Sequence, residues 1–197
     1  MYKQYLLMLM SVLLVSSCNQ PTVFKEVKIN NRYTISIPDY LQPTPDAGKE
    51  ASLQYQNTEK DVYAIVIEEK KKTMANYDLN YNVDTYFNSI ASQSFIESIK
   101  NGKVSIPGRE TINGNKALIA EITGQINETD VIYKMAIIET PYTFYQILVW
   151  CRAQNKTKYE GDMMKIIESF KELPLSKDEL PAPPSTLNDS VKIDLKY

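Results

Sequence analysis

The sequence predicts an α+β domain in which a single antiparallel sheet of about six to seven strands has helices packed against it. Three observations support this fold class. Several segments alternate apolar and polar residues with the period of a strand, and two repeat apolar residues with the period of a helix. Four consecutive strand-like segments are joined only by short turns, which makes them an antiparallel meander.

The first half of the domain contains four strand-like segments, at about residues 24–28, 33–37, 51–56 and 62–68. Asn30 and Asn31 form a turn pair between the first two, because asparagine tolerates positive φ angles. The segment 62–68 places apolar residues on both of its faces. We therefore expect this strand to be covered on both sides.

Two helices are predicted, at residues 83–100 and 158–171. Both carry apolar side chains at helical spacing along one face. Asn82 is the candidate N-cap of the first helix, which ends at Asn101-Gly102, and Thr157 is the candidate cap of the second.

The meander begins at a strong hairpin signal. Asn113-Gly114 lies between two strand-like runs, as in a two-residue type I′ turn. Strands at 116–126, 131–139 and 143–152 follow, with a turn at 127–130 between the first two of them. Cys151 lies in the last of these strands, where we interpret it as a small buried hydrophobic residue.

Glu121 is the carboxylate that most needs an interpretation, because it lies among apolar residues in the middle of a strand. If Ile126 pairs with Val131, Glu121 lies opposite Ala136 and diagonal to Lys134. It could then be a general base with a raised pKa. A cross-strand ion pair with Lys134 is the simpler interpretation, and the one that we favour.

The N-terminus has the features of an export signal. Lys3 precedes an apolar run at residues 6–15, which is too short to span a bilayer. Val15-Ser16-Ser17-Cys18 resembles the lipobox of bacterial lipoproteins. The resemblance implies removal of residues 1–17 as a signal peptide and attachment of acyl chains, palmitate among them, to Cys18, with residues 18–23 as a lipidated tether. The alternatives are a plain signal peptide or an apolar helix that ends at a cysteine by chance.

The sequence predicts no catalytic, metal-binding or cofactor-binding residues. There is no histidine, which removes Ser–His and Cys–His catalysis and histidine metal ligation. No EF-hand loop, glycine-rich phosphate loop or Gly-x-Ser-x-Gly turn is present. The net charge of −2 is typical of a protein without a nucleic-acid partner. We therefore do not expect an enzyme.

Short motifs across residues 24–173 resemble the PsbP/DcrB-like superfamily. They are Tyr33-Thr-Ile-Ser-Ile-Pro38, Gly114-Asn-Lys-Ala-Leu-Ile119, Phe144-Tyr-Gln-Ile147 and Ile167-Glu-Ser-Phe-Lys171. The Gly-Trp that usually follows the first proline is absent. The resemblance implies an α/β/α sandwich that binds another protein without catalysis.

Together these features predict a membrane-anchored envelope lipoprotein that acts as a non-catalytic, protein-binding accessory module. Because Asn19 rather than Asp follows Cys18, we expect the outer membrane, with the domain facing the periplasm. The expected binding surfaces are a sheet edge, a tyrosine-rich region and the proline-rich C-terminal segment 174–197, whose residues 191–197 alternate like a strand. The alternative is a small-ligand or glycan-binding lipoprotein that uses Tyr55, Tyr63, Tyr77, Tyr81 and Tyr86. The lysine run at residues 70–72 is interpreted as a solvated edge, with contact to lipid headgroups as its alternative.

Overall fold

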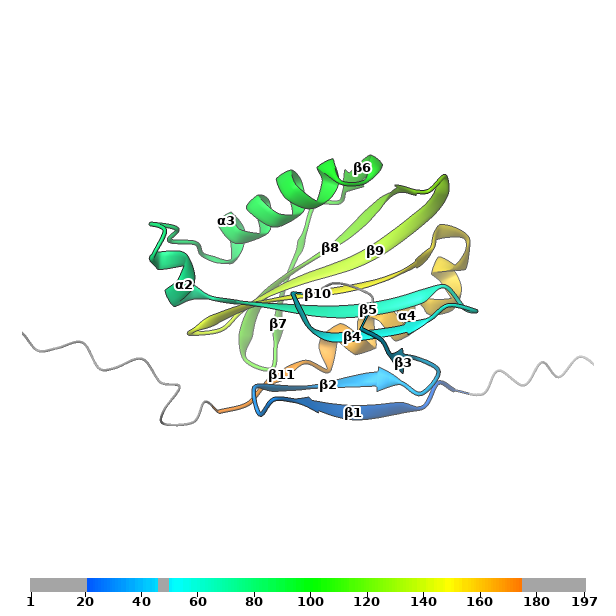
Figure 1. Cartoon of the computed structure of the whole chain (residues 1–197), viewed down its shortest axis with the longest axis horizontal. Coiled ribbons are helices and arrows are strands. Elements are labelled where there is room, and N and C mark those ends of the chain that lie inside the picture. Colours follow the sequence, from blue (N-terminus) through cyan, green and yellow to red (C-terminus); the bar gives the residue numbers. More distant parts are fainter. Residues whose placement is uncertain (1–20, 46–49, 175–197) are drawn as a thin grey trace, which may run out of the picture.

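The four longest strands lie side by side at the centre of the fold (Figure 1). In spatial order they are β5 (Val62–Lys70), β10 (Thr143–Arg152), β9 (Thr129–Glu139) and β8 (Asn115–Ile126). Four shorter strands extend this antiparallel sheet: β4 (Ala51–Asn57) and β3 (Gln42–Pro43) beyond β5, and β6 (Lys100–Val104) and β7 (Gly108–Ile112) beyond β8. The α+β class is confirmed, with eight strands in this sheet.

The structure is a computed structural model that describes residues 21–45 and 50–174. The predicted signal peptide, Cys18 and the C-terminal segment beyond Pro174 lie outside the described residues. In the described part of the chain, no helix has both the length and the apolar character needed to cross a membrane.

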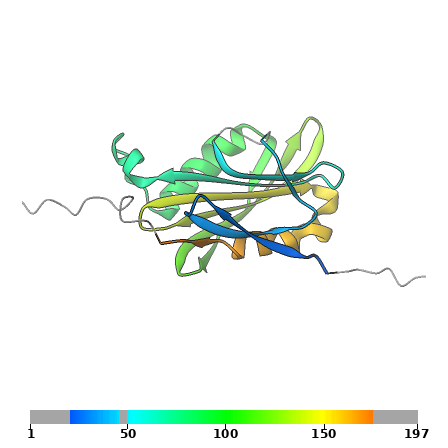
Figure 2. The ribbon, with the colours of Figure 1, turned by 60° about the horizontal axis from the view of Figure 1, so that its bottom comes forward.

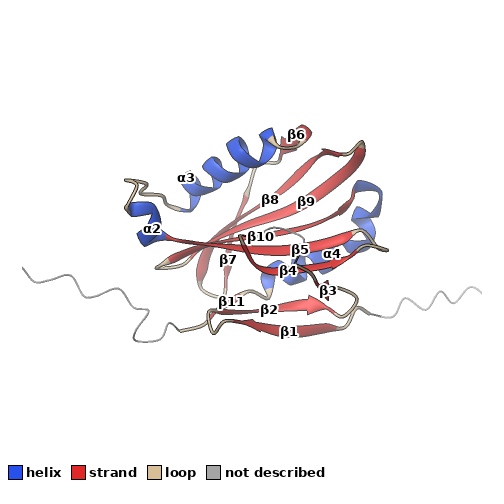
Figure 3. Cartoon of the chain, in the orientation of Figure 1, coloured by secondary structure: helices blue, strands red, loops and turns tan. Residues whose placement is uncertain are grey.

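Both faces of the central sheet are buried. One face packs against a helical segment formed by α3 (Val83–Phe87) and η2 (Asn88–Phe95). The other packs against α4 (Lys156–Glu168) and a second, smaller sheet. Figure 3 shows these layers above and below the long strands. The expectation that residues 62–68 are covered on both sides is confirmed.

The smaller sheet consists of β1 (Phe24–Ile29), β2 (Tyr33–Pro38) and β11 (Lys171–Glu172). The sequence predicts one sheet, whereas the structure has two. The reason is that β2 pairs with β1 on one side and, on the other, with two residues that follow α4. An alternating pattern within one segment does not reveal such a distant partner.

The turn between β8 and β9 is shorter than predicted. Asn127 and Glu128 have φ angles of 47° and 64°, as a two-residue type I′ turn requires. Ile126 therefore pairs with Thr129, and Glu121 lies opposite Lys134 rather than Ala136. Because the register shifts by two residues, Glu121 and Lys134 still lie on the same face of the sheet, as predicted.

The first helix begins where the sequence predicts but ends earlier. The Asn82 side chain accepts hydrogen bonds from the backbone N–H groups of Asp84 and Thr85, each at 3.0 Å, in a capping box. The segment then becomes a π-helix over η2, and Lys100 already belongs to β6. A π-helical turn changes the spacing of side chains on the sheet, so an α-helical period misjudges the end of the segment.

The second helix, α4, begins at Lys156, directly after the short 3₁₀ helix η3 (Ala153–Asn155). The prediction of Thr157 as its cap is wrong. Asn155 holds the N-cap position and its side chain makes no capping hydrogen bond.

The two ends of the described chain leave at opposite ends of β2. Phe24 pairs with Pro38, at one end of this strand, and Glu172 pairs with Tyr33, at the other. Figures 1 and 2 show these two ends of the described chain on opposite sides of the domain. The domain therefore has a tether end, where residue 21 enters, and a far end, where residue 174 leaves.

A pair of glycine substitutions tests this packing. A Cβ on Gly124 of β8 would overlap the Ile99 side chain and lie 3.1 Å from the Lys100 carbonyl oxygen. We expect Gly124→Ala to lower the free energy of unfolding by about 1–3 kcal/mol, because the added methyl group also meets the Lys100 backbone, which cannot move aside as a flexible side chain can. Gly161→Ala, in α4 where nothing lies within 4 Å, should raise it by about 1 kcal/mol. Urea denaturation measures both, and equal stability of Gly124→Ala and wild type would contradict the packing.

Candidate functional site

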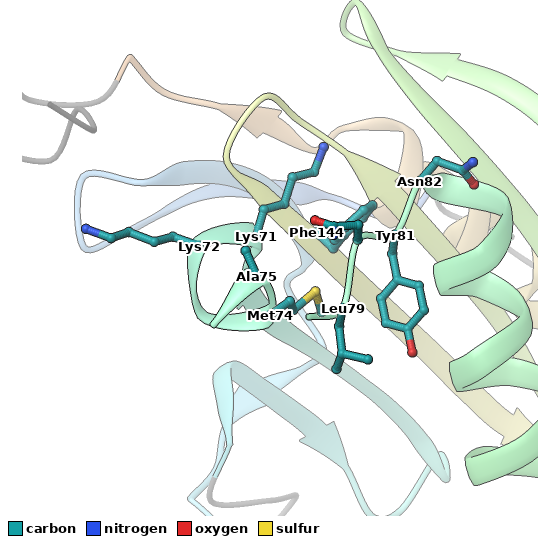
Figure 4. A pocket seen from close by; sticks show the side chains of 9 residues that line it. Lys71, Lys72, Met74, Ala75, Leu79, Tyr81, Asn82 and Phe144 are labelled. Atoms are coloured by element: carbon teal, nitrogen blue, oxygen red, sulfur yellow. The ribbon is translucent and has the colours of Figure 1, made fainter. Parts of the chain in front are cut away.

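A pocket of about 400 Å³ opens at the far end, where the chain leaves β5 and passes through α2 (Lys71–Ala75) toward α3. Figure 4 shows side chains from α2, the loop before α3 and the start of β10 around this pocket. The lining residues are Lys71, Lys72, Met74, Ala75, Leu79, Asn80, Tyr81, Asn82 and Phe144. The pocket is thus lined by both apolar side chains and amide or ammonium groups.

Glu139, at the end of β9, holds the walls of this far-end pocket together. One carboxylate oxygen accepts a hydrogen bond from the Lys71 ammonium at 2.7 Å. The other accepts one from the Val83 backbone N–H at 3.1 Å, at the start of α3. The same Lys71 nitrogen lies 4.7 Å from the centre of the Phe144 ring. One carboxylate therefore fixes α2 and α3 relative to the sheet.

The floor of the pocket is an aromatic stack. The rings of Phe144 and Tyr86 lie 4.3 Å apart and are inclined by only 13°. The Gln146 side-chain amide donates a hydrogen bond to the Tyr86 hydroxyl at 2.7 Å. Burial, followed by the charge of Glu69, raises the pKa of Tyr86 well above its ordinary value. The stack is thus a rigid, un-ionised floor of the pocket and not a reactive group.

Exposed apolar side chains surround this pocket. Tyr77 is 74% exposed, Leu79 42% and Tyr142 40%. Tyr142 lies beside α2, because its carbonyl oxygen accepts a hydrogen bond from the Lys71 backbone N–H. Lys70 and Lys72 are exposed as well. We call these five residues, with the pocket, the far-end surface.

A second cavity, of about 420 Å³, opens at the tether end on the same face of the sheet as α3. Its core is a row of three aromatic rings on paired residues of β5, β10 and β9. Trp150 lies between Tyr63 and Tyr133, with ring centres 5.0 and 5.3 Å away and inclinations of 11° and 28°. We call this row the aromatic ladder.

The central ring of the ladder has no free face. Both faces of Trp150 are covered by its neighbours, and Phe95 meets Tyr133 edge-on at 5.0 Å. Burial raises the pKa of Tyr133 to about 12. A sugar ring stacks on an aromatic face, so Trp150 offers no such platform. The cavity is an apolar groove, bordered by the ion pair between Arg152 and Asp61.

The tyrosines proposed from the sequence do not form one surface. Tyr63 belongs to the aromatic ladder, whereas Tyr77, Tyr81 and Tyr86 lie at the far end. Tyr55 packs against the core on the side of α4. Sequence reasoning missed Tyr133 and Trp150 as partners of Tyr63, because only the strand register brings them together.

Glu121 forms an ion-pair network under α4. Its carboxylate lies 3.0 Å from the Lys134 ammonium and 2.8 Å from that of Lys156, and Lys134 also pairs with Glu160 at 2.8 Å. Burial opposes ionisation of Glu121, but hydrogen bonds from Lys156 and Lys134 outweigh it and lower its pKa. The ion-pair interpretation is confirmed, and the raised pKa expected of a general base is not found.

A buried polar cluster, which the sequence did not reveal, joins the two sheets at the far end. Arg32 pairs with Glu68 at 3.0 Å, and the Tyr145 hydroxyl donates a hydrogen bond to Glu172 at 3.1 Å. Burial raises the pKa of Glu172. The Leu173 backbone N–H donates to the Arg32 carbonyl oxygen at 2.7 Å, which extends the pairing of β11 with β2 inside the small sheet.

Cys151 is buried, as predicted, and burial raises the pKa of its thiol to about 11. It therefore remains protonated near neutral pH. Within residues 21–45 and 50–174, no three Cys, Asp or Glu side chains come together as metal ligands.

Comparison with solved structures places this architecture among PsbP-like folds. Cyanobacterial PsbP (CyanoP) from Synechocystis sp. PCC 6803 aligns with a TM-score of 0.56 at 9% identity, over 82% of this chain and 99% of that one. LpqN, involved in cell envelope biogenesis of Mycobacterium tuberculosis, aligns with a TM-score of 0.53 at 11% identity, over 79% and 87% of the two chains. No protein-family model and no curated protein sequence matches the chain. The protein thus has a PsbP-like α+β fold, and the identities are too low to carry a function with it.

The Glu121 network predicts a stability that depends on pH. Because the folded-state pKa lies below the unfolded value of about 4.3, the stabilisation is complete above that value and is lost as the pH falls through the folded pKa. Wild type should therefore exceed Glu121→Gln by about 1–2 kcal/mol at pH 7, with a smaller difference near pH 3. Urea denaturation at both pH values, with exposed Glu110→Gln as control, measures this. A difference that does not shrink at low pH would contradict the assignment.

Proposed function

We propose that the protein is a membrane-anchored envelope lipoprotein, attached through acyl chains on Cys18, that binds another envelope protein without catalysing a reaction. The observation that carries this proposal is the far-end surface. It combines a formed pocket with three of the six exposed large hydrophobic residues in the described part of the chain. Exposed apolar groups gathered around a pocket are typical of an interaction site.

The pocket is suited to an apolar anchor side chain. Met74, Leu79 and Phe144 supply apolar contact, and Figure 4 shows Lys72 pointing away from the pocket toward its surroundings. Lys70 and Lys72 are exposed beside it and favour acidic groups on the partner. A partner segment with one apolar side chain flanked by carboxylates fits this arrangement.

Anchoring supports the same proposal through geometry. The predicted lipid attaches near residue 21, at the tether end, whereas the far-end surface lies at the opposite end of the sheet. A tethered module has a raised effective concentration for partners in the same membrane. The PsbP-like fold and the envelope role of LpqN agree with this proposal. The outer membrane, with the domain facing the periplasm, is the location that we propose from Asn19.

Crosslinking in living cells tests the protein-binding role. A photo-crosslinking amino acid in place of Leu79 should give one dominant adduct with another envelope protein, identified by mass spectrometry. Leu79→Asp should lower recovery of that complex at least fivefold, because a buried carboxylate in an apolar contact costs several kcal/mol.

Ile106 provides the matched control, because it is an apolar residue that is 95% exposed and lies between β6 and β7. The crosslinker at position 106 should not give the adduct. The Ile106→Asp variant should not lower recovery of the complex. Equal labelling from both positions, or no repeated adduct from position 79, would contradict the proposed surface.

The groove beside the aromatic ladder favours a second candidate function, the binding of a small apolar ligand. It has a cavity volume of about 420 Å³, within the range of ligand sites. Ile126, which is 40% exposed, adds an apolar side chain at its rim. The covered faces of Trp150 favour an apolar ligand over a glycan.

Trp150 reports on this candidate directly, because it is the single tryptophan of the chain and lies in the groove. An apolar ligand should change its fluorescence and raise the melting temperature. Tyr63→Ala should weaken binding several-fold, and Tyr142→Ala, at the far end, should not. A panel of apolar compounds without a change in fluorescence or melting temperature would remove this candidate.

A further inference from the structure

The point where the chain enters the domain is fixed on α4. The Thr22 hydroxyl donates a hydrogen bond to the Asp162 carboxylate at 2.9 Å, and the Val23 carbonyl oxygen accepts one from the Asp39 backbone N–H at 2.9 Å. Cys18 precedes Thr22 by four residues, which reach at most about 14 Å when fully extended. If Cys18 carries the proposed lipid, Asp162 lies within about that distance of the headgroups.

Three lysine–aromatic pairs surround this entry point. The Lys165 ammonium lies 4.1 Å from the Phe24 ring centre, and that of Lys158 lies 5.1 Å from the Tyr159 ring. The third pair joins Lys60 and Tyr40 at 5.8 Å.

The pairs form one continuous surface. The Tyr40 and Tyr159 rings are 5.9 Å apart, and the Tyr40 hydroxyl donates to the same Asp162 carboxylate that holds Thr22, at 3.0 Å. Figure 2 shows α4 beside the incoming chain.

The chemistry of this surface fits a membrane interface. Lysine stems cover aromatic rings while the ammonium groups remain in water, and aromatic residues with lysines are typical of the headgroup region. Lys158, Gly161 and Lys165 lie at helical spacing on the exposed side of α4, and Gly161 leaves the space between the two lysines open.

Three of the acidic groups nearby are engaged with other partners. Asp162 accepts two hydroxyl hydrogen bonds, Glu160 pairs with Lys134 and Asp61 pairs with Arg152. Exposed carboxylates also border the surface: Asp39 beside Tyr40, Glu59 beside Lys60 and Glu168 after Lys165. Lys60, Lys158 and Lys165 are the cationic groups beside the point where the chain enters the domain.

We propose that this surface, formed by Phe24, Tyr40, Lys60, Lys158 and Lys165, binds the phosphate groups of an anionic phospholipid bilayer. The inference rests on the proposed lipid anchor for its orientation. Acyl chains and a basic patch are two membrane signals that act together. With both engaged, α4 lies against the bilayer and the far-end surface faces away from it.

Vesicle sedimentation tests the proposal on residues 18–197, carrying Cys18→Ser so that no lipid contributes. The chain should bind vesicles of phosphatidylglycerol and phosphatidylethanolamine but not vesicles of phosphatidylcholine. Lys158→Gln combined with Lys165→Gln should lower the partition coefficient roughly 25-fold, about fivefold per lysine. Lys60→Gln, on a different element, should lower it about fivefold. Unchanged melting temperatures show that the variants fold.

Lys100→Gln combined with Lys103→Gln is the matched control, because both lysines are exposed and lie on β6, on another part of the surface. Its partition coefficient should stay within twofold of the parent. An equal loss in this control, or equal binding to both kinds of vesicle, would overturn the proposal. The anchor is tested separately, by incorporation of labelled palmitate into wild type and not into Cys18→Ser. Vesicle binding can be interpreted if palmitate is not incorporated, and palmitate incorporation can be interpreted if vesicles are not bound.

Discussion

The structure depends on the burial of both faces of its central strands. Successive residues of a strand point to opposite faces of the sheet, and in β9 and β10 most residues on both faces are apolar and buried. Such a sheet needs a cover on each side. The helical segment α3–η2 supplies one, and α4 with the small sheet supplies the other. The charged pair of Glu121 and Lys134 is covered in the same way, because α4 supplies Lys156 as a second partner of Glu121 and Glu160 as a second partner of Lys134.

The same constraint places both candidate sites. The 5 residues of α3 and the 8 of η2 together span at most about 20 Å, whereas β10 has 10 residues and spans about 33 Å. A helical cover is thus shorter than the strands, so the strand ends extend past it. On the face covered by α3–η2, aromatic side chains occupy those ends. Phe144 forms the floor of the pocket at the far end, and Trp150 forms the centre of the aromatic ladder at the tether end.

Features that depend on neighbouring residues could be predicted from the sequence. The Asn113-Gly114 turn has φ angles of 47° and 85°, and Asn82 caps its helix. Both effects act within three residues. The small sheet and the aromatic ladder could not be predicted, because they depend on the register between strands that are distant in the chain. The turn at Asn127 shows the boundary between the two cases: Asn127 is a turn residue by type, but the left-handed conformation of Glu128 has no signal in the sequence.

The lysines are interpreted differently once their distance from the point where the chain enters the domain is known. The run at residues 70–72 is the most conspicuous cationic segment in the sequence, and contact with lipid headgroups was one interpretation of it. Lys71, however, is engaged by Glu139, and the run lies at the far end, opposite the entry of the chain. Lys60, Lys158 and Lys165 are scattered in the sequence, yet the fold brings them together near Thr22, where Asp162 is hydrogen-bonded to both Thr22 and Tyr40. If Cys18 carries the proposed lipid, four residues before Thr22, this folded cluster lies nearer to the bilayer than the lysine run does.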